Sequence, residues 1–382
     1  MNFDNSEEQQ MIIDSVRRFV ANESPVERFR RMREDERGWE PKVWAKMAEQ
    51  GWLAVCYPEE QGGFGGSFVD AALILEQLGR GLVPEPYIAS VVLAGGLISR
   101  LGSPEQIESF LTPMISGETS LALAFAERQS RYNLADCQSS AEKSGAGYVL
   151  RGEKAWVLNG HAADQLVVVA RTSGDQLDDE GLSLFVVDGD APGLKRVPFL
   201  GMDGQKTALI TLDGVEVGAD RLLGEEGKAL ASLEWAVDRG ASAACAEAQG
   251  ELQELFERTN EYLKERKQFG RAIGSFQALQ HKMADMFAET ELCRGTMLMS
   301  ALQVDIEDAT ERMHDVSCAK IQLTDGGWLV QKNAVQLHGG IAVTDEHDAG
   351  LFFKRVRVLQ GLFGDADHHA DRIQKLPSFE AA

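Results

Sequence analysis

The spacing of apolar residues changes twice along this chain, and these two changes constrain its fold more than any other feature. Up to about residue 118, and again from about residue 224, apolar side chains recur at helical intervals. Between these parts lie short apolar runs separated by Gly, Asp and Ser turns, a pattern typical of β-strands. The sequence therefore predicts a mainly α protein with a middle β domain, divided into a helical domain (1–118), a β-barrel or sandwich (119–223) and a helical bundle (224–382).

Local signals predict the individual elements. Ser6 to Gln9 has the pattern of a capping box in front of a first helix. The glycine-rich stretch 58–67 lacks the Lys-Ser/Thr of a P-loop and the spacing of a dinucleotide fingerprint, so it predicts a tight loop between helices. Further helices are predicted over about 40–50, 69–80, 84–101, 227–266, 275–304, 308–336 and 349–375, and strands over 121–126, 156–158, 166–170, 182–187 and 208–212.

The net charge of the 382-residue chain is −22, which argues against nucleic acid or an anionic membrane as a partner. No apolar run approaches the length of about 18 residues that a membrane span needs. Five cysteines are scattered singly, which fits the reduced thiols of a cytoplasmic protein better than a disulfide framework or a zinc site. Adjacent His368 and His369 would point to different sides of a helix, so no metal site is predicted. A polyanionic ligand would need a local cationic patch, for which the candidates are Arg266/Lys267/Arg271 and Lys354/Arg355/Arg357.

The stretch 261–285, EYLKERKQFGRAIGSFQALQHKMAD, has helical residues on both sides of a Gly270/Gly274 break. The break brings together an Arg able to bind a phosphate bidentately, two amides, and two rings suited to a flat heteroaromatic group. From the spacing alone, a helix–turn–helix corner with solvated charges is an equally good interpretation. The residues concerned are Arg266, Gln268, Phe269, Phe276 and Gln277.

This stretch, followed by QLHGGIAVTDEH from Gln336, closely resembles the paired signatures of the acyl-CoA dehydrogenase family. The family consists of flavoproteins that oxidise acyl-CoA thioesters to 2-enoyl-CoA. The resemblance covers essentially the whole chain and implies an N-terminal helical domain, a β domain and a C-terminal four-helix bundle. It also implies FAD as cofactor, a homotetramer or heterotetramer in which neighbouring subunits share each FAD, and an electron-transfer flavoprotein as electron acceptor.

Within the family, the tail FFKRVRVLQGLFGDADHH, together with SEEQQ and AERQSRYNLAD, most resembles the pimeloyl-CoA dehydrogenase small subunit. That group lies near chains that work in mixed α2β2 assemblies. The resemblance therefore implies a bulky or dicarboxylic acyl-CoA as substrate, including steroid side chains.

The resemblance also assigns residues to the cofactor. Trp156, in KAWVLNG, would lie against the isoalloxazine, although Leu158 replaces the Thr/Ser hydroxyl that the family places near flavin N5. Losing that donor could cost about 1 kcal/mol or more. From the neighbouring subunit, Arg266 and Gln268 would bind the pyrophosphate, Phe269 and Gln277 would lie near the adenosine half, and Gln336, Gly339 and Gly340 would allow a close backbone approach to the pyrophosphate. We interpret the neighbouring His338 as structural.

A second departure from the family is the loop from Ala126 to Asp136, which is longer than the family's T-E-P-x-x-G-S-D loop and has no glycine. Ser130 remains a candidate to serve the flavin or the substrate. Arg128 and Arg131 are candidates to pair with phosphates or with a substrate carboxylate. Surface arginines in a loop are the equally good alternative.

The position of the proton-abstracting base is the most informative departure. Many family members carry Glu where this chain has Phe363, and Phe cannot be a base. The N–H of residue 363 survives and could still donate to the thioester carbonyl, which would make the α-proton more acidic. A minority of the family carries the base directly before an Arg on another helix, and here the matching pair is Asp238-Arg239, with Arg239 at the substrate. Asp238 is therefore the candidate base; Glu234 is a weaker one, and a purely structural carboxylate is the alternative.

Three functions remain open at this point. The first is FAD-dependent α,β-dehydrogenation of an acyl-CoA, with Asp238 taking the pro-R α-proton. The second is a non-catalytic or half-site partner subunit, which Leu158 and Phe363 favour. The third is flavin chemistry without a base, such as elimination of a sulfinate.

Overall fold

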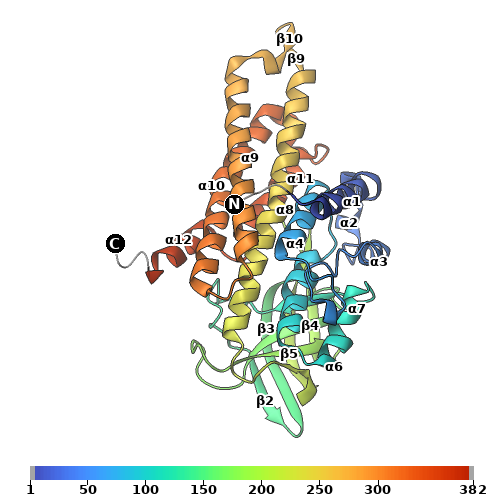
Figure 1. Ribbon diagram of the computed structural model, residues 1–382, viewed down its shortest axis with the longest axis vertical. Coiled ribbons are helices and arrows are strands. Elements are labelled where there is room, and N and C mark those ends of the chain that lie inside the picture. The colour runs from blue at the N-terminus through green and yellow to red at the C-terminus, as the bar shows by residue number, and fades with distance from the viewer. Residues whose placement is uncertain (1–4, 378–382) are drawn as a thin grey trace.

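The computed structural model describes residues 5–377 and has the predicted fold class, with helices at both ends of the chain and a β domain in the middle (Figure 1). The predicted capping box is present, since Ser6 Oγ accepts from Gln9 N–H and the Gln9 side chain accepts from Ser6 N–H, both at 3.1 Å. The N-terminal helices are α1 (Glu7–Glu23), α2 (Val26–Glu34), α3 (Pro41–Glu49), η1 (Glu59–Gln61), α4 (Phe68–Arg80), η2 (Ile88–Gly95), α5 (Gly96–Leu101), α6 (Pro104–Gln106), η3 (Ile107–Leu111) and α7 (Thr112–Ile115).

The middle domain is a twisted sheet with the strand order β6-β7-β3-β2-β4-β5-β8, to which β1 adds by pairing in parallel with β4. Strand β4 is buried on both faces. Its Val167 and Val169 belong to the core shared with the helices, while Leu166 and Val168 belong to a separate core within the β domain. The strands are β1 (Leu121–Ala124), β2 (Ser140–Ser144), β3 (Gly147–Leu158), β4 (Gln165–Arg171), β5 (Leu182–Asp188), β6 (Leu194–Leu200), β7 (Lys206–Gly218) and β8 (Leu222–Leu223).

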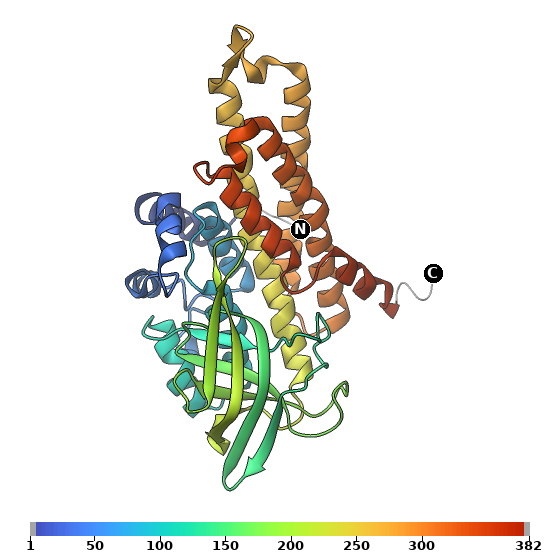
Figure 2. The same ribbon diagram turned by 180° about the vertical axis from the view of Figure 1, so that it is seen from behind.

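The C-terminal domain is a helical bundle built on α8, which runs through the middle of the molecule (Figures 1 and 2). A side chain at Gly250 would collide with the carbonyl of Glu76, and one at Gly79 with that of Glu247, so glycines allow α8 and α4 to pack closely. The elements are α8 (Leu230–Glu265), the hairpin β9 (Lys267–Gln268) and β10 (Arg271–Ala272), η5 (Ile273–Ser275), α9 (Gln277–Gln303), α10 (Ala309–His338), η6 (Gly339–Val343), α11 (Ala349–Gly361) and α12 (Ala366–Gln374).

The helix predicted over 349–375 is wrong in one respect, because a turn at 362–365 divides it into α11 and α12. Phe363 has a φ of +61° and Gly364 a φ of +120°, neither of which a helix can accommodate. The side chain of Asp365 then caps α12 by accepting from His368 N–H at 2.9 Å. Across residues 5–377, none of the helices combines the length and apolar character needed to cross a bilayer.

Candidate active site

Trp156 lies at a β-bulge in β3, where the register with β7 shifts between Lys154 and Val157. Its φ of +57° is uncommon for a bulky residue, and bulges of this kind turn a side chain away from the sheet. The indole is 64% exposed and packs edge-on against Phe199, with ring centroids 5.0 Å apart. An exposed ring on a fixed strand is available to stack on a flat ligand.

Leu158, two residues further, lines a small cleft of about 60 Å³ where the β domain, the N-terminal helices and the C-terminal bundle meet. Apolar side chains form much of the wall, but charged groups of both signs also reach it. The lining includes Phe29, Trp39, Leu75, Leu78, Val83, Tyr87, Ile88 and Ala89, together with Arg33, Arg37, His161, Lys206, Arg355, Glu85 and Glu247.

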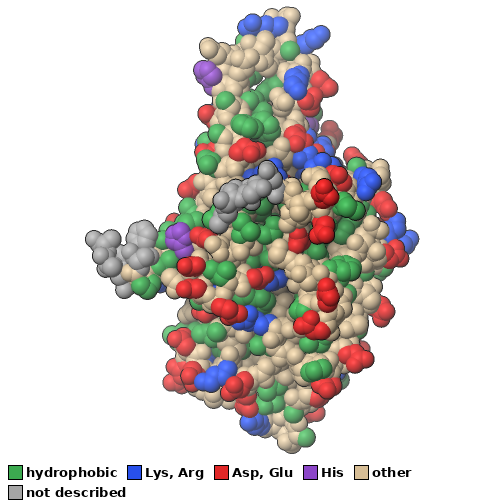
Figure 3. All heavy atoms as spheres, viewed as in Figure 1, with side chains coloured by type: hydrophobic (Ala, Val, Ile, Leu, Met, Phe, Trp, Pro, Cys, Tyr) green, Lys and Arg blue, Asp and Glu red, His purple; other side chains and the backbone are tan. Residues whose placement is uncertain are grey.

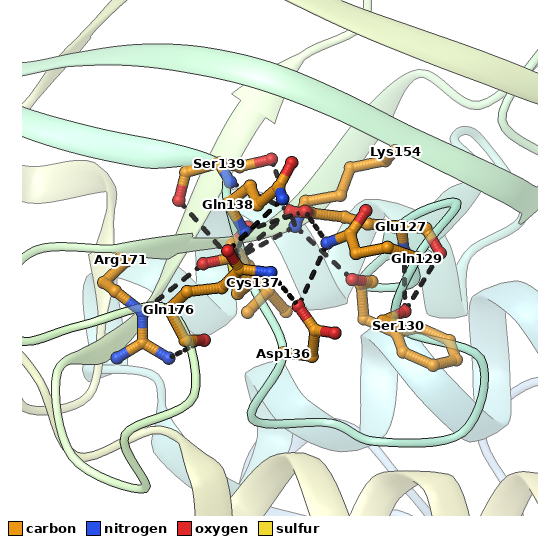
Figure 4. A network of polar contacts seen from close by, with 12 residues as sticks. Glu127, Gln129, Ser130, Asp136, Cys137, Gln138, Ser139, Lys154, Arg171 and Gln176 are labelled. Atoms are coloured by element: carbon orange, nitrogen blue, oxygen red, sulfur yellow. Dashed lines mark hydrogen bonds and ion pairs between the residues drawn. The ribbon is translucent and has the colours of Figure 1, made fainter.

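The base of the bulge is held by a buried ion pair between Lys154 and Glu127, 2.6 Å apart (Figure 4). The Glu127 carboxylate also accepts from Ser139 N–H and Oγ at 3.0 and 2.7 Å, from Gln138 N–H at 2.8 Å and from Gln129 at 2.8 Å. Burial alone would raise the pKa of Glu127, but the Lys154 ammonium and these donors outweigh it and lower the pKa to about 2. Glu127 thus fastens the predicted 126–136 loop to β3.

Within that loop, Ser130 is buried and its hydroxyl closes a local turn, accepting from Glu127 N–H and donating to Glu127 O, both at 3.0 Å. The loop arginines point outward. Arg131 is exposed with a φ of +47°, and the exposed Arg128 comes only within 3.9 Å of Glu153. Arg128 and Arg131 are therefore accessible at the surface of the loop, whereas the Ser130 hydroxyl is engaged in hydrogen bonds within the loop.

The residues assigned to the FAD of a neighbouring subunit gather at the tip of the bundle, around the β9–β10 hairpin. Phe269 is 92% exposed and lies edge-on to Phe276, with centroids 6.1 Å apart, while Arg271 stacks on Phe276 at 4.2 Å. Arg266, Gln268 and Gln277 are exposed beside them. Figure 3 shows Lys and Arg side chains gathered at this tip, so the first of the two predicted cationic patches is accessible.

The second signature is also open to a ligand. Gln336 is exposed in the last turn of α10, and Gly339 follows with a φ of +72°. A methyl group added at Gly339 or Gly340 would meet no atom within 4 Å, so this backbone is free to be approached. His338 is buried, with Nδ1 2.8 Å from Ala334 O.

The second cationic patch is only partly free, because Lys354 and Arg357 are exposed but Arg355 is not. Arg355 is buried between Asp203 and Glu247, at 2.8 and 2.7 Å, and cannot serve a ligand from outside. Burial lowers the pKa of Arg355, but the two carboxylates outweigh it and the net shift is upward. Among residues 5–377, no cluster of three or more His, Cys, Asp or Glu side chains is arranged to hold a metal.

Asp238 is 2% exposed on α8, and both of its carboxylate oxygens are occupied. Oδ2 accepts from Arg312 Nε of α10 at 3.1 Å, and Oδ1 accepts from Arg372 of α12 at 2.7 Å. Asp238 therefore joins α8 to α10 and α12 through two ion pairs, and it is not paired with the adjacent Arg239.

Arg239 points instead toward the N-terminal domain. It pairs with Asp305 and its guanidinium lies over the rings of Phe68 and Trp235, 4.6 and 4.7 Å from their centroids. Since Arg239 is buried by these contacts, it would have to leave them to reach a substrate.

Phe363 is half-buried in the turn after α11, and its ring packs on the face of α8 at Gly240. A methyl group added at Gly240 would lie 3.0 Å from the Phe363 ring and 2.9 Å from Leu93. Successive helical residues are about 100° apart, so Asp238 projects from α8 about 200° away from the face that meets Phe363. The structure brings Phe363 and Leu93 together and keeps Asp238 on the other side of the helix.

Sequence reasoning missed the residues that hold these parts in place: Glu127 with Lys154, Arg312 with Arg372, and Lys320. A signal existed for Lys320, because it is one turn from Val316 on the buried face of α10, where a lysine is unusual. For the others the partners come from separate elements, and no local pattern joins them.

Models described as the N-terminal, middle and C-terminal domains of acyl-CoA dehydrogenase match residues 6–118, 122–215 and 228–376. Together with the relative described next, these matches show that the chain belongs to the acyl-CoA dehydrogenase family, whose members are FAD-dependent enzymes acting on CH–CH bonds.

Individual relatives cover nearly the whole chain. A probable acyl-CoA dehydrogenase, YngJ of Bacillus subtilis, is 31% identical over 94% of this chain and 95% of its own length. The mitochondrial isovaleryl-CoA dehydrogenase of Pongo abelii is 28% identical over 93% of this chain and 85% of its own. Among solved structures, the ChsE4–ChsE5 complex of Mycobacterium tuberculosis contains a chain that is 28% identical, with a TM-score of 0.88 over 98% of both chains.

Proposed function

We propose that this chain binds FAD and an acyl-CoA thioester and acts in α,β-dehydrogenation, with a bulky or dicarboxylic acyl group as substrate. Bound FAD would accept the β-hydride at N5. Trp156 would support the flavin ring, the N–H of Phe363 would bind the thioester carbonyl, and an electron-transfer flavoprotein would collect the electrons. The absence of paired cysteines in the sequence supports a cytoplasmic location.

The observation that carries this proposal is the separation of the two halves of the flavin site. The exposed Trp156 lies in the β domain, whereas Arg266, Gln268 and Phe269 lie at the far tip of the bundle (Figure 1). On this proposal the two halves of one FAD site come from different chains, and a second chain brings its tip to the first chain's Trp156. A homotetramer and a heterotetramer both satisfy this requirement.

The flavin content of the chain purified alone tests the assembly. A self-sufficient dehydrogenase should contain about one FAD per subunit, and acyl-CoA should bleach its visible absorbance. Arg266→Ala should weaken FAD binding about tenfold or more, because an ion-assisted hydrogen bond contributes about 1.5–3 kcal/mol. The control is Lys264→Ala, since Lys264 is exposed on α8 and paired only with Glu261; it should leave the flavin content unchanged. Full flavin content in Arg266→Ala would contradict the shared site.

A second candidate function is a half-site partner subunit, in a heteromeric assembly like that named for the ChsE4–ChsE5 complex. The double ion pair of Asp238 favours it, because a base held by two arginines must leave both to take a proton. A chain that is colourless alone, and binds flavin at about half occupancy only when co-expressed with a second chain, would establish this reading. The resemblance to the pimeloyl-CoA dehydrogenase small subunit is part of the same proposal.

On this proposal a dicarboxylic substrate would pair its distal carboxylate with Arg37, on the wall of the cleft beside Leu158. Arg131, on the exposed loop, is better placed for a CoA phosphate. We expect a dicarboxylic acyl-CoA to be preferred over a monocarboxylic one of equal length by about tenfold in kcat/KM. Arg37→Ala should remove this preference, whereas Arg128→Ala should not. Equal turnover of both substrates by the unmodified protein would refute a dicarboxylic substrate.

A further inference from the structure

Lys320 of α10 is fully buried and has no carboxylate partner among the described residues. Its ammonium instead donates to three backbone carbonyls at the end of α11: Leu359 O at 2.7 Å, Gln360 O at 3.1 Å and Leu362 O at 2.7 Å. A helix leaves its last carbonyls without partners, and a cation there also complements the helix dipole. Lys320 therefore fastens the turn that carries Phe363.

The remaining contacts of the turn hold it from other sides. The Tyr132 hydroxyl donates to Gly361 O at 3.2 Å, and Val358 O accepts from Leu362 N–H at 3.0 Å. His369 is buried against Gly364, where a side chain would collide with the imidazole. The turn is thus fixed by α10, by α12 and by the loop that Glu127 anchors.

The bond from Lys320 to Leu362 O has a chemical consequence, because that carbonyl shares one peptide unit with the N–H of Phe363. The described chain has no cis peptide, so the C=O and N–H of this unit point in opposite directions. Lys320 holds one end of the unit, and no acceptor for the other end, Phe363 N–H, occurs among residues 5–377. A hydrogen bond to one end of a peptide polarises the other end.

We propose that Lys320 is a positioning residue for the reaction: through the Leu362–Phe363 peptide, its ammonium orients and polarises the Phe363 N–H that binds the thioester carbonyl. The inference rests on the proposed function, which assigns that N–H to the substrate. The chain from Nζ through C=O and N–H to the thioester oxygen would then stabilise negative charge as the α-proton leaves.

The charge state of Lys320 agrees with this role. Burial lowers the pKa of Lys320 to about 8, so the ammonium is the main form at neutral pH. The titratable groups facing it are Cys245 of α8, Asp365 and His369 of α12. Burial raises the pKa of Cys245 to about 11 and lowers the pKa of His369 to about 2, so both are neutral at pH 7.

Acetoacetyl-CoA provides a test that needs no catalytic base, because it ionises to its enolate spontaneously and the enolate absorbs in the ultraviolet. The flavin-loaded protein, co-expressed with a second chain if one is required, is titrated with this probe over a range of pH. Lys320→Met should raise the pKa of bound acetoacetyl-CoA by about one unit, equivalent to a tenfold loss of enolate stabilisation. Lys320→Gln, which keeps a neutral donor, should behave like Lys320→Met if charge is what matters.

The outcomes separate the two proposals. If the unmodified protein binds flavin but gives no enolate signal, the assignment of Phe363 N–H fails and the role of Lys320 fails with it. If the unmodified protein stabilises the enolate and both folded variants do so equally, Lys320 only caps α11 and the inference is overturned.

A further measurement uses the unmodified protein, in case neither variant folds. Acetyl-CoA cannot be oxidised because it has no β-carbon, so the infrared stretch of its ¹³C-labelled thioester carbonyl can be followed while it is bound. The stretch should move toward its free-solution frequency as pH rises through about 8 and Lys320 loses its proton. A frequency that is constant from pH 6 to 9.5 would overturn the inference.

Discussion

Phe363→Glu is expected to raise the rate at which acyl-CoA bleaches the flavin by about 10²- to 10⁴-fold, the usual contribution of a positioned general base. The Phe363 ring lies beside Gly240, at the position where the family resemblance leads us to expect glutamate. A carboxylate there would lie next to the α-carbon of a thioester held by the N–H of the same residue. Anaerobic stopped-flow absorbance measures the rate. Phe363→Gln, which has the same size without basicity, is the matched control and should show no gain.

Asp238→Asn decides which carboxylate accepts the proton. If Asp238 only clamps α8 to α10 and α12, the Phe363→Glu/Asp238→Asn double variant should keep its bleaching. It should lose roughly 3 kcal/mol of unfolding free energy, because Arg312 and Arg372 lose their buried partner. If Asp238→Asn abolishes bleaching both in the unmodified protein and in the Phe363→Glu variant, and does not lower the free energy of unfolding, Asp238 is the base. Unchanged bleaching in every background would favour flavin chemistry that needs no base.

Glu127→Gln is expected to destabilise the protein by about 3–5 kcal/mol, because it leaves the Lys154 ammonium buried without a counter-charge. The double variant Glu127→Gln/Lys154→Met removes both charges and should recover much of that loss. Urea unfolding at pH 7, with flavin release followed in parallel, measures both effects. The bulge at Trp156 should loosen in the single variant, so flavin should be released at lower urea than in the unmodified protein.

The same pair predicts a pH dependence. Since the folded-state pKa of Glu127 lies near 2, below its value of about 4.3 in the unfolded chain, its stabilisation is complete above about pH 5 and is lost as pH falls toward 2. The unmodified protein should therefore lose more stability between pH 5 and 3 than the double variant, which lacks this carboxylate. Equal acid sensitivity of the two proteins would contradict the assignment.

The sequence by itself determined the fold class, the order of its helical and β parts, and the family, since these depend on local periodicity and on contiguous signatures such as RKQFG and QLHGG. It also showed that residue 363 cannot be a base, since that depends only on the identity of the residue. Within residues 349–375 it could not locate the break, because the left-handed turn is held by Lys320 and Tyr132 from distant parts of the chain.

Only the tertiary structure decided where Asp238 points and what holds it. A helical position fixes a direction relative to its own helix, but which helices surround it depends on packing between segments more than 70 residues apart in sequence, as the bonds to Arg312 and Arg372 show. The ion pair of Glu127 with Lys154 and the hydrogen bond from Lys320 to Leu362 O also join separate elements of the fold. Their energetic value comes from burial, and burial is a property of the assembled core rather than of any local run of residues.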